Sequence, residues 1–178
     1  MNVGATACPR PLSAAKNRLS RFKFMNDDNA HTRKNSLRLA NFDYSASRVY
    51  FVTIVVLERR TVFYNKELAS EVVDCLLRLR EQLQFNLYGY CLMPNHIHAL
   101  LGTGESAKDL GKICGAFKSL TTRIYWKYGK GALWQRGYHD HIIRNETDFF
   151  ECLKYTKENP LKENLENWEF VGRVDYLR

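Results

Sequence analysis

The sequence lacks the cysteine spacing of a zinc knuckle or of a disulfide framework. Its five cysteines are odd in number and widely scattered, and no two of them are separated by only two residues. We therefore expect reduced thiols, mostly as small buried apolar groups, in a cytoplasmic protein. The chain also lacks an apolar run long enough to span a membrane, and its N-terminus lacks the apolar core of a secretory signal.

Acidic residues are scarce relative to basic ones. The chain has 19 Asp and Glu against 27 Lys and Arg, and the net charge of +8 favours a polyanionic partner. Residues 1–44 hold eight basic and three acidic residues, so this segment carries +5 of the total. We predict a basic, disordered arm here, followed by one domain at 45–178. A solvated tail without function and an organelle transit peptide are the alternatives for the arm.

The pattern of apolar residues predicts seven elements. They are strands at 48–57, 86–92 and 96–101, a fourth strand entered from a loop at 133–144, and helices at 66–83, 107–128 and 148–158. Their order is that of a ferredoxin-like βαββαβ unit, an α+β fold with an antiparallel sheet. We expect helices on one face of the sheet, the other face free for function, and an added C-terminal helix.

Three helix ends follow from local sequence. Asn65 is a suitable N-cap for the first helix and Thr147 for the third. The third helix is expected to stop at Asn159, because a residue before proline is pushed out of helical geometry, and Pro160 follows. Residues 161–178 are expected to form an irregular tail.

A pair of histidines follows the predicted turn at 93–95. Proline fixes one turn dihedral and asparagine tolerates the left-handed region, so a hairpin is expected. Because side chains alternate along a strand, His96 and His98 share one face, while Ile97 and Ala99 point into a core on the other. Two adjacent imidazoles are able to bind one divalent ion. Taken alone, the pair is equally compatible with two surface histidines.

Tyr155 and Asn159 lie four residues apart on the third predicted helix, so they share one side of it. A tyrosine beside a metal-bound phosphate can act as a covalent nucleophile. An amide oxygen one turn away could complete the coordination of the ion. The plain alternatives are an ordinary tyrosine of an amphipathic helix and an asparagine that ends the helix.

The second predicted helix carries a basic face. Its cations are Lys108, Lys112, Lys118 and Arg123, together with Lys127. Hydroxyl side chains lie among them, and this mixture favours phosphate contacts over a merely solvated surface.

Four blocks of the sequence resemble the REP-associated tyrosine transposases. They lie at 93–101, 133–136, 141–144 and 155–162. These proteins belong with the small single-tyrosine insertion-sequence transposases, which share a histidine-hydrophobe-histidine strand and a tyrosine on a later helix. The likeness spans about residues 48–165 in order and spacing, and it leaves the N-terminal arm unexplained.

The resemblance implies a nuclease and strand transferase that acts on single-stranded DNA, often at hairpin-forming sites, through a 5′-phosphotyrosine intermediate. It implies that His96 and His98 hold Mg or Mn and that Tyr155 attacks the phosphate. Asn159 stands where insertion-sequence relatives use a glutamine as third ligand. His141, in a matched block, is the second candidate for contact with metal or phosphate.

Several alternatives stay open at this stage. Arg136 and Arg144 lie in matched blocks and join the predicted DNA contacts, and Tyr138 is a rival nucleophile on position alone. A domesticated protein that only binds nucleic-acid hairpins and a metal-dependent hydrolase using water are the competing functions. The residues do not reveal the DNA target, the host or mobile-element role, or whether the protein is a homodimer or a monomer.

Overall fold

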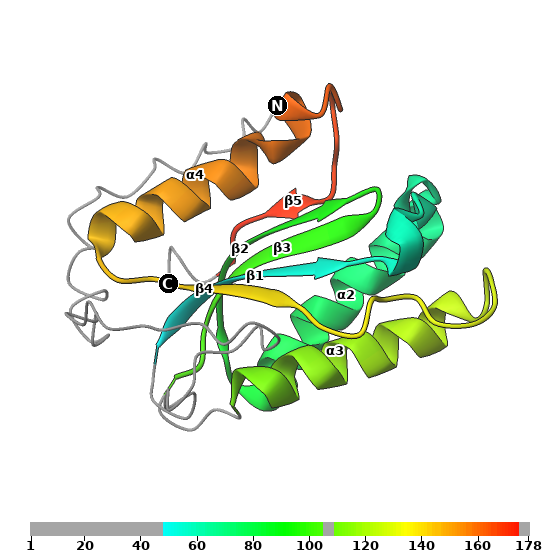
Figure 1. The fold of residues 1–178 in the computed structure, drawn as a ribbon, viewed down its shortest axis with the longest axis horizontal. Coiled ribbons are helices and arrows are strands. Elements are labelled where there is room, and N and C mark those ends of the chain that lie inside the picture. The colour runs from blue at the N-terminus through cyan, green and yellow to red at the C-terminus, as the bar shows by residue number, and fades with distance from the viewer. Residues whose placement is uncertain (1–47, 105–108, 175–178) are drawn as a thin grey trace, which may run out of the picture.

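A five-stranded antiparallel sheet organises the chain, with strand order β4-β1-β3-β2-β5 (Figure 1). This computed structural model describes residues 48–104 and 109–174. The elements are β1 (Val49–Val55), the short 3-10 helices η1 (Leu57–Arg59) and η2 (Val62–Tyr64), α2 (Lys66–Leu83), β2 (Asn86–Met93), β3 (His96–Gly102), α3 (Leu110–Tyr125), β4 (His139–Ile142), α4 (Glu146–Lys162) and β5 (Val171–Gly172). The predicted α+β, ferredoxin-like arrangement is confirmed.

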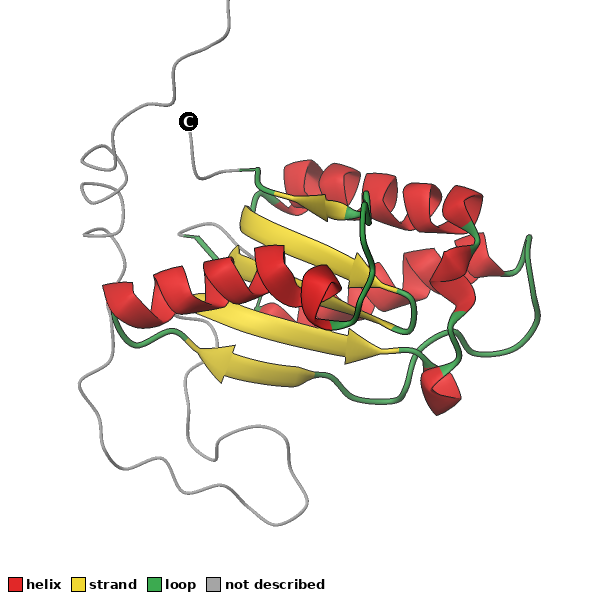
Figure 2. Ribbon diagram, turned by 90° about the horizontal axis from the view of Figure 1, so that it is seen from above, coloured by secondary structure: helices red, strands yellow, loops and turns green. Residues whose placement is uncertain are grey.

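The sheet separates two cores. Helices α2 and α3 cover one face, where Ile97 and Ala99 are buried as predicted. Helix α4 lies across the other face and forms a smaller core around Phe149, Leu153 and Leu100. Seen from above, α4 lies in front of the strands (Figure 2). The face expected to be free is therefore partly covered by the helix that carries Tyr155.

The first helix and the hairpin lie where the sequence places them. Asn65 caps α2 by accepting a hydrogen bond from the Leu68 amide. The hairpin turn does not use the left-handed conformation expected for asparagine, since Asn95 has no positive φ. Its geometry is fixed from outside instead, because Val56 N–H donates to the Asn95 carbonyl and Phe63 N–H to that of Pro94.

Helix α3 is shorter than predicted. Asp109 is its N-cap and accepts from the Lys112 amide, and the helix ends at Tyr125 rather than at residue 128. Its predicted first residues, Lys108 among them, and the predicted arm at 1–44 lie outside the described residues.

Helix α4 is longer than predicted at both ends. Its N-cap is Asn145, which accepts from the Asp148 amide, and Thr147 lies inside the first turn. The helix also continues through Pro160 to Lys162. A proline inside a helix costs about 3 kcal/mol locally. Asn159 and Pro160 are both buried, and a local rule does not include the free energy that such tertiary burial contributes.

The segment after α4 is not wholly irregular. Residues Val171 and Gly172 form β5, which pairs with β2 as an added edge strand. Trp168 secures the segment, because its indole N–H donates to the Leu92 carbonyl. None of the helices in the two described ranges combines the length and hydrophobicity needed to cross a bilayer.

Replacing Phe149 with alanine should loosen α4 from the sheet. Phe149 is fully buried and makes an edge-to-face contact with Tyr88 at 5.1 Å between ring centroids. We expect Phe149→Ala to lower the free energy of unfolding by about 3–5 kcal/mol in urea titrations. Phe150→Ala is the matched control, since Phe150 is only partly buried. Equal losses in the two variants would contradict this account of the second core.

Candidate active site

The two histidines of β3 converge on one point. Nε2 of His96 lies 3.0 Å from Nε2 of His98. Strand pairing sets this geometry, because both residues lie on the face of β3 that α4 crosses, opposite the core of Ile97 and Ala99. His98 is buried and His96 is partly buried.

The Nδ1 atoms of both imidazole rings have hydrogen-bond partners. His96 Nδ1 donates to Asn95 Oδ1 at 2.5 Å, which leaves the lone pair on Nε2. His98 Nδ1 lies 2.8 Å from the Thr53 hydroxyl, which either donates or accepts. A hydrogen bond between the two Nε2 atoms therefore requires His98 to donate through Nε2 to His96. When Thr53 accepts from Nδ1 instead, the lone pairs of both Nε2 atoms face the same point.

Burial keeps both imidazoles neutral. Burial, with a smaller contribution from the neighbouring His96, lowers the pKa of His98 to about 3. Burial also lowers the pKa of His96; the negative charge of Glu163 opposes this effect and Arg59 adds to it. Neutral imidazole is the form that binds metals.

These residues fit a divalent ion. Two nitrogens bound at about 2.1 Å in neighbouring octahedral positions lie about 3.0 Å apart, which matches the separation of the two Nε2 atoms. Partners on the outer nitrogens of metal-binding histidines fix ring orientation, as Asn95 and Thr53 do here.

The low pKa of His98 predicts a loss of stability in acid. The unfolded chain binds a proton at His98 near pH 6.5, whereas the folded protein binds it only near pH 3. Below pH 6.5 the unfolded state holds more protons, so stability falls as the pH falls. In chelator we expect wild type to lose about 2 kcal/mol more than His98→Gln between pH 7 and pH 5. Parallel losses in urea titrations of the two proteins would contradict this.

Tyr155 lies beside the histidine pair. Its ring centroid is 5.3 Å from that of His98 and 5.8 Å from that of Phe51, which stacks on His98. The ammonium group of Lys162 lies 4.7 Å from the centre of the Tyr155 ring, a cation–π distance. The tyrosine side chain is 38% exposed, so solvent and substrate reach it.

Asn159 lies one turn after Tyr155 on the same side of α4, and Glu163 is the C-cap residue of this helix. Asn159 is buried, and its Nδ2 has no hydrogen-bond partner among the described residues. Glu163 lines a cavity of about 230 Å³ together with His96 and Arg59. Glu163, Lys162 and Arg59 were not among the predicted site residues, because the helix was expected to end at Asn159 and no role was assigned to the segment that forms η1.

His141 is not part of the histidine pair. It lies on the same sheet face, opposite Phe51 in the β1–β4 register. Its Nε2 contacts both carboxylate oxygens of Asp148, at 2.8 and 2.9 Å. Tyr138, the rival nucleophile, packs partly buried against the main core on the α2–α3 side.

The predicted DNA-binding cations are dispersed. Lys112 and Arg123 are exposed on α3, which the sheet separates from the histidines. The Lys118 ammonium donates to the carbonyls of Gln135, Arg136 and Gly137, so it anchors the loop that these residues form. Arg136 in that loop and Arg144, before α4, are exposed.

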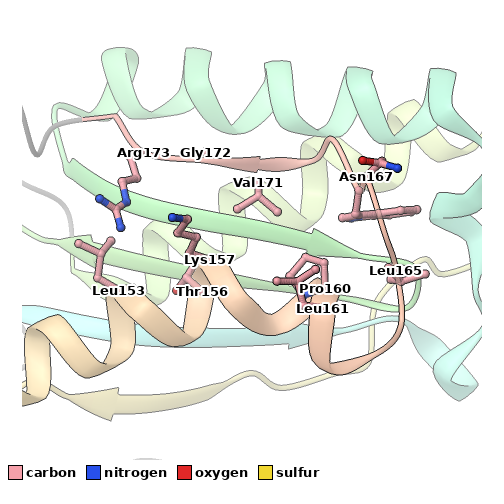
Figure 3. Close-up of a pocket in the computed structure, with 11 residues that line it drawn as sticks. Leu153, Thr156, Lys157, Pro160, Leu161, Leu165, Asn167, Val171, Gly172 and Arg173 are labelled. Atoms are coloured by element: carbon pink, nitrogen blue, oxygen red, sulfur yellow. The ribbon is translucent and has the colours of Figure 1, made fainter. Parts of the chain in front are cut away.

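A second hollow lies on the other flank of α4, between this helix and β5 (Figure 3). It encloses about 510 Å³ and is mainly apolar, with Pro160, Leu161 and Trp168 among its lining residues. Lys157 and Arg173 lie toward the end of it near Leu153.

Comparison with known proteins places the chain in a family. The family model described as "Transposase IS200 like" matches residues 45–159, and the chain belongs to this family. Its members are DNA-cleaving and strand-transferring enzymes that depend on a metal, and the predicted membership is confirmed.

Individual relatives agree with this assignment. The chain is 27% identical, over 72% of its length and 81% of the relative's, to a Haemophilus influenzae protein named as a REP-associated tyrosine transposase. It is 19% identical to the REP-associated tyrosine transposase of Escherichia coli, over 71% and 77% of the two chains. A solved structure of a REP-associated tyrosine transposase bound to a REP hairpin shares its fold, with a TM-score of 0.60, 19% identity, and coverage of 70% and 75%.

Proposed function

We propose that the protein cleaves and rejoins single-stranded DNA through a covalent bond to Tyr155, at sites next to DNA hairpins. One observation carries the proposal: a ring that can supply a nucleophilic hydroxyl lies 5.3 Å from one of two histidines whose Nε2 atoms converge. A protein that only binds hairpins has no need of this arrangement. The similar protein solved with a REP hairpin supports hairpin DNA as the partner.

The ion would be held by His96 and His98, and Asn159 and Glu163 are the candidates for additional oxygen ligands. Mg or Mn suits this site, because carboxylate, amide and phosphate oxygens are the ligands that both ions prefer. When bound, the ion polarises the scissile phosphate and neutralises the charge that develops on it.

The reaction exchanges one phosphodiester bond for another. The Tyr155 hydroxyl loses its proton to solvent and its oxygen bonds to phosphorus, while the bond from phosphorus to the 3′-oxygen breaks and that oxygen takes up a proton. The products are a 5′-phosphotyrosine and a free 3′-hydroxyl. A second 3′-hydroxyl reverses the exchange, so rejoining needs no ATP.

Positioning supplies much of the rate. Phe51 and His98 contact the Tyr155 ring from the sheet, and Lys162 contacts it from the next turns of α4. Holding a nucleophile in line with a bound phosphate converts a bimolecular encounter into an intramolecular step. The Lys162 ammonium also places a positive charge where the phosphate approaches.

The direct test uses labelled single-stranded hairpin DNA with Mn or Mg. After denaturation, the expected result is a protein–DNA adduct that survives, accompanied by a fragment with a free 3′-hydroxyl. Tight binding of a panel of hairpins without any adduct would favour the domesticated binding protein instead.

The basic N-terminal segment is expected to add non-specific DNA affinity. It carries eight Lys and Arg residues, and each phosphate contact steepens the dependence of binding on salt. A chain starting at Ser45 should bind single-stranded DNA more weakly than the full chain at low salt, with a shallower slope of log affinity against log salt. Identical slopes would contradict the prediction.

A further inference from the structure

A second group of metal-ligating side chains lies at the start of α4, apart from the histidine pair. The group consists of His141 on β4 and of Asp148 and Cys152 on α4. One imidazole nitrogen, one carboxylate oxygen and one sulfur from these residues all lie within 4.8 Å of one another. Asp148 and Cys152 are four residues apart, so they face the same side of the helix.

We propose that His141, Asp148 and Cys152 bind a second divalent ion of the zinc type. A set of nitrogen, oxygen and sulfur donors selects Zn²⁺, or Co²⁺ as its substitute, over the Mg²⁺ or Mn²⁺ that an oxygen-rich site prefers. The proposal does not rest on the catalytic function, because none of the three residues belongs to the histidine pair or carries the nucleophile.

The two separations from Asp148 Oδ1 require little adjustment, whereas the nitrogen and the sulfur lie within 4.8 Å of each other and close onto the ion when it binds. Around a tetrahedral Zn²⁺, nitrogen and oxygen ligands lie about 3.3 Å apart and sulfur lies about 3.6 Å from either. His141 Nε2 lies 2.8 Å from Asp148 Oδ1, and Cys152 Sγ lies 3.8 Å from the same oxygen. The first distance opens by about half an ångström when the ion replaces the hydrogen bond, a movement that the half-exposed imidazole allows.

Asp148 is already oriented by the backbone. The Arg144 amide donates to its Oδ2 at 3.0 Å, while the side chain is only 19% exposed. Such outer partners fix the direction of a ligand. On binding, the Cys152 thiol gives up its proton to solvent, and water fills the remaining position.

Occupation of this site would tie β4 to the first turns of α4. Cys152 precedes Tyr155 by three residues on the same helix, so the ion would brace the segment that presents the tyrosine. The three residues are positioning residues in this respect, because none of them touches the reacting atoms.

Cobalt titration of the full-length protein tests the proposal. Wild type should bind cobalt with a thiolate-to-cobalt charge-transfer band and retain zinc on dialysis. Cys152→Ser should lose the band and one metal equivalent, whereas His96→Ala should keep the band. Cys75→Ser is the matched thiol control, since Cys75 lies on α2. No band in wild type, or an unchanged band in Cys152→Ser, would overturn the site and leave the His141–Asp148 contact as a hydrogen bond.

A second measurement tests the site independently in case Cys152→Ser fails to fold. His141 is exposed on an edge strand, so His141→Gln should preserve the fold. Zinc at about 100 times its dissociation constant should raise the melting midpoint of wild type by about 5–10 °C and leave that of His141→Gln unchanged. Equal shifts in the two proteins would exclude His141 as a ligand.

Discussion

Tyr155→Phe is expected to abolish the covalent DNA adduct and to lower cleavage by at least about 10⁴-fold, because it deletes the only atom that forms the bond to phosphorus. The phenyl ring keeps the contacts with His98 and Phe51, so the site should remain assembled. Hairpin affinity should change less than about threefold. The measurement compares the denaturation-resistant adduct with binding in the same samples.

Tyr138→Phe is the matched control for this substitution. It removes a phenolic oxygen from a residue on the other side of the sheet, packed against the main core, and should retain the adduct. Adduct loss in Tyr138→Phe alone would keep the chemistry and move the nucleophile. Cleavage that persists without an adduct in Tyr155→Phe would point to hydrolysis by activated water.

Much of this site follows from short periodicities. Alternation along β3 is enough to place His96 and His98 on one face, and the four-residue spacing places Tyr155 and Asn159 on one side of a helix. Neither rule predicts that the histidine face of β3 meets the tyrosine side of the helix. The resemblance to a family implied this contact, and in the structure it depends on α4 crossing the sheet over β2 and β3.

Local sequence rules did not predict the site residues that follow Asn159. A local rule ends the helix before Pro160, yet α4 continues to Lys162, with Asn159 and Pro160 both buried. Lys162, whose ammonium lies beside the Tyr155 ring, is therefore helical, and Glu163 is the C-cap residue, in a segment that was expected to be an irregular tail.

Local rules also could not place the basic surface. A helix face rich in lysine predicts contacts with phosphate, yet α3 packs on the far side of the sheet from the histidines. Lys118 uses its donors within the protein, and only a contact more than fifteen residues away in sequence reveals that. Charge pattern identifies a partner class, while topology decides which cations reach the reacting phosphate.

His96→Ala should remove the divalent ion from the catalytic site and reduce cleavage by about 10²–10⁴-fold. The substitution deletes one of two convergent nitrogens and leaves His98 held by Thr53. Mn²⁺ affinity, followed by electron paramagnetic resonance, should fall by at least tenfold, while hairpin binding in chelator should be unchanged. Measuring both affinities separates a loss of metal binding from a loss of DNA binding.

Glu163→Gln and Asn159→Ala then rank the remaining ligands. The Glu163 carboxylate carries the negative charge that Mn²⁺ favours, and it lines the small cavity with His96, whose pKa it raises. Glu163→Gln keeps the size of the side chain and removes its charge, so it should weaken Mn²⁺ binding. Asn159→Ala removes the buried amide whose Nδ2 has no hydrogen-bond partner in the described part of the chain. If Mn²⁺ affinity survives His96→Ala, the ion lies elsewhere and the histidine pair is structural. If it survives Glu163→Gln but not Asn159→Ala, the amide is the third ligand, as the resemblance implies.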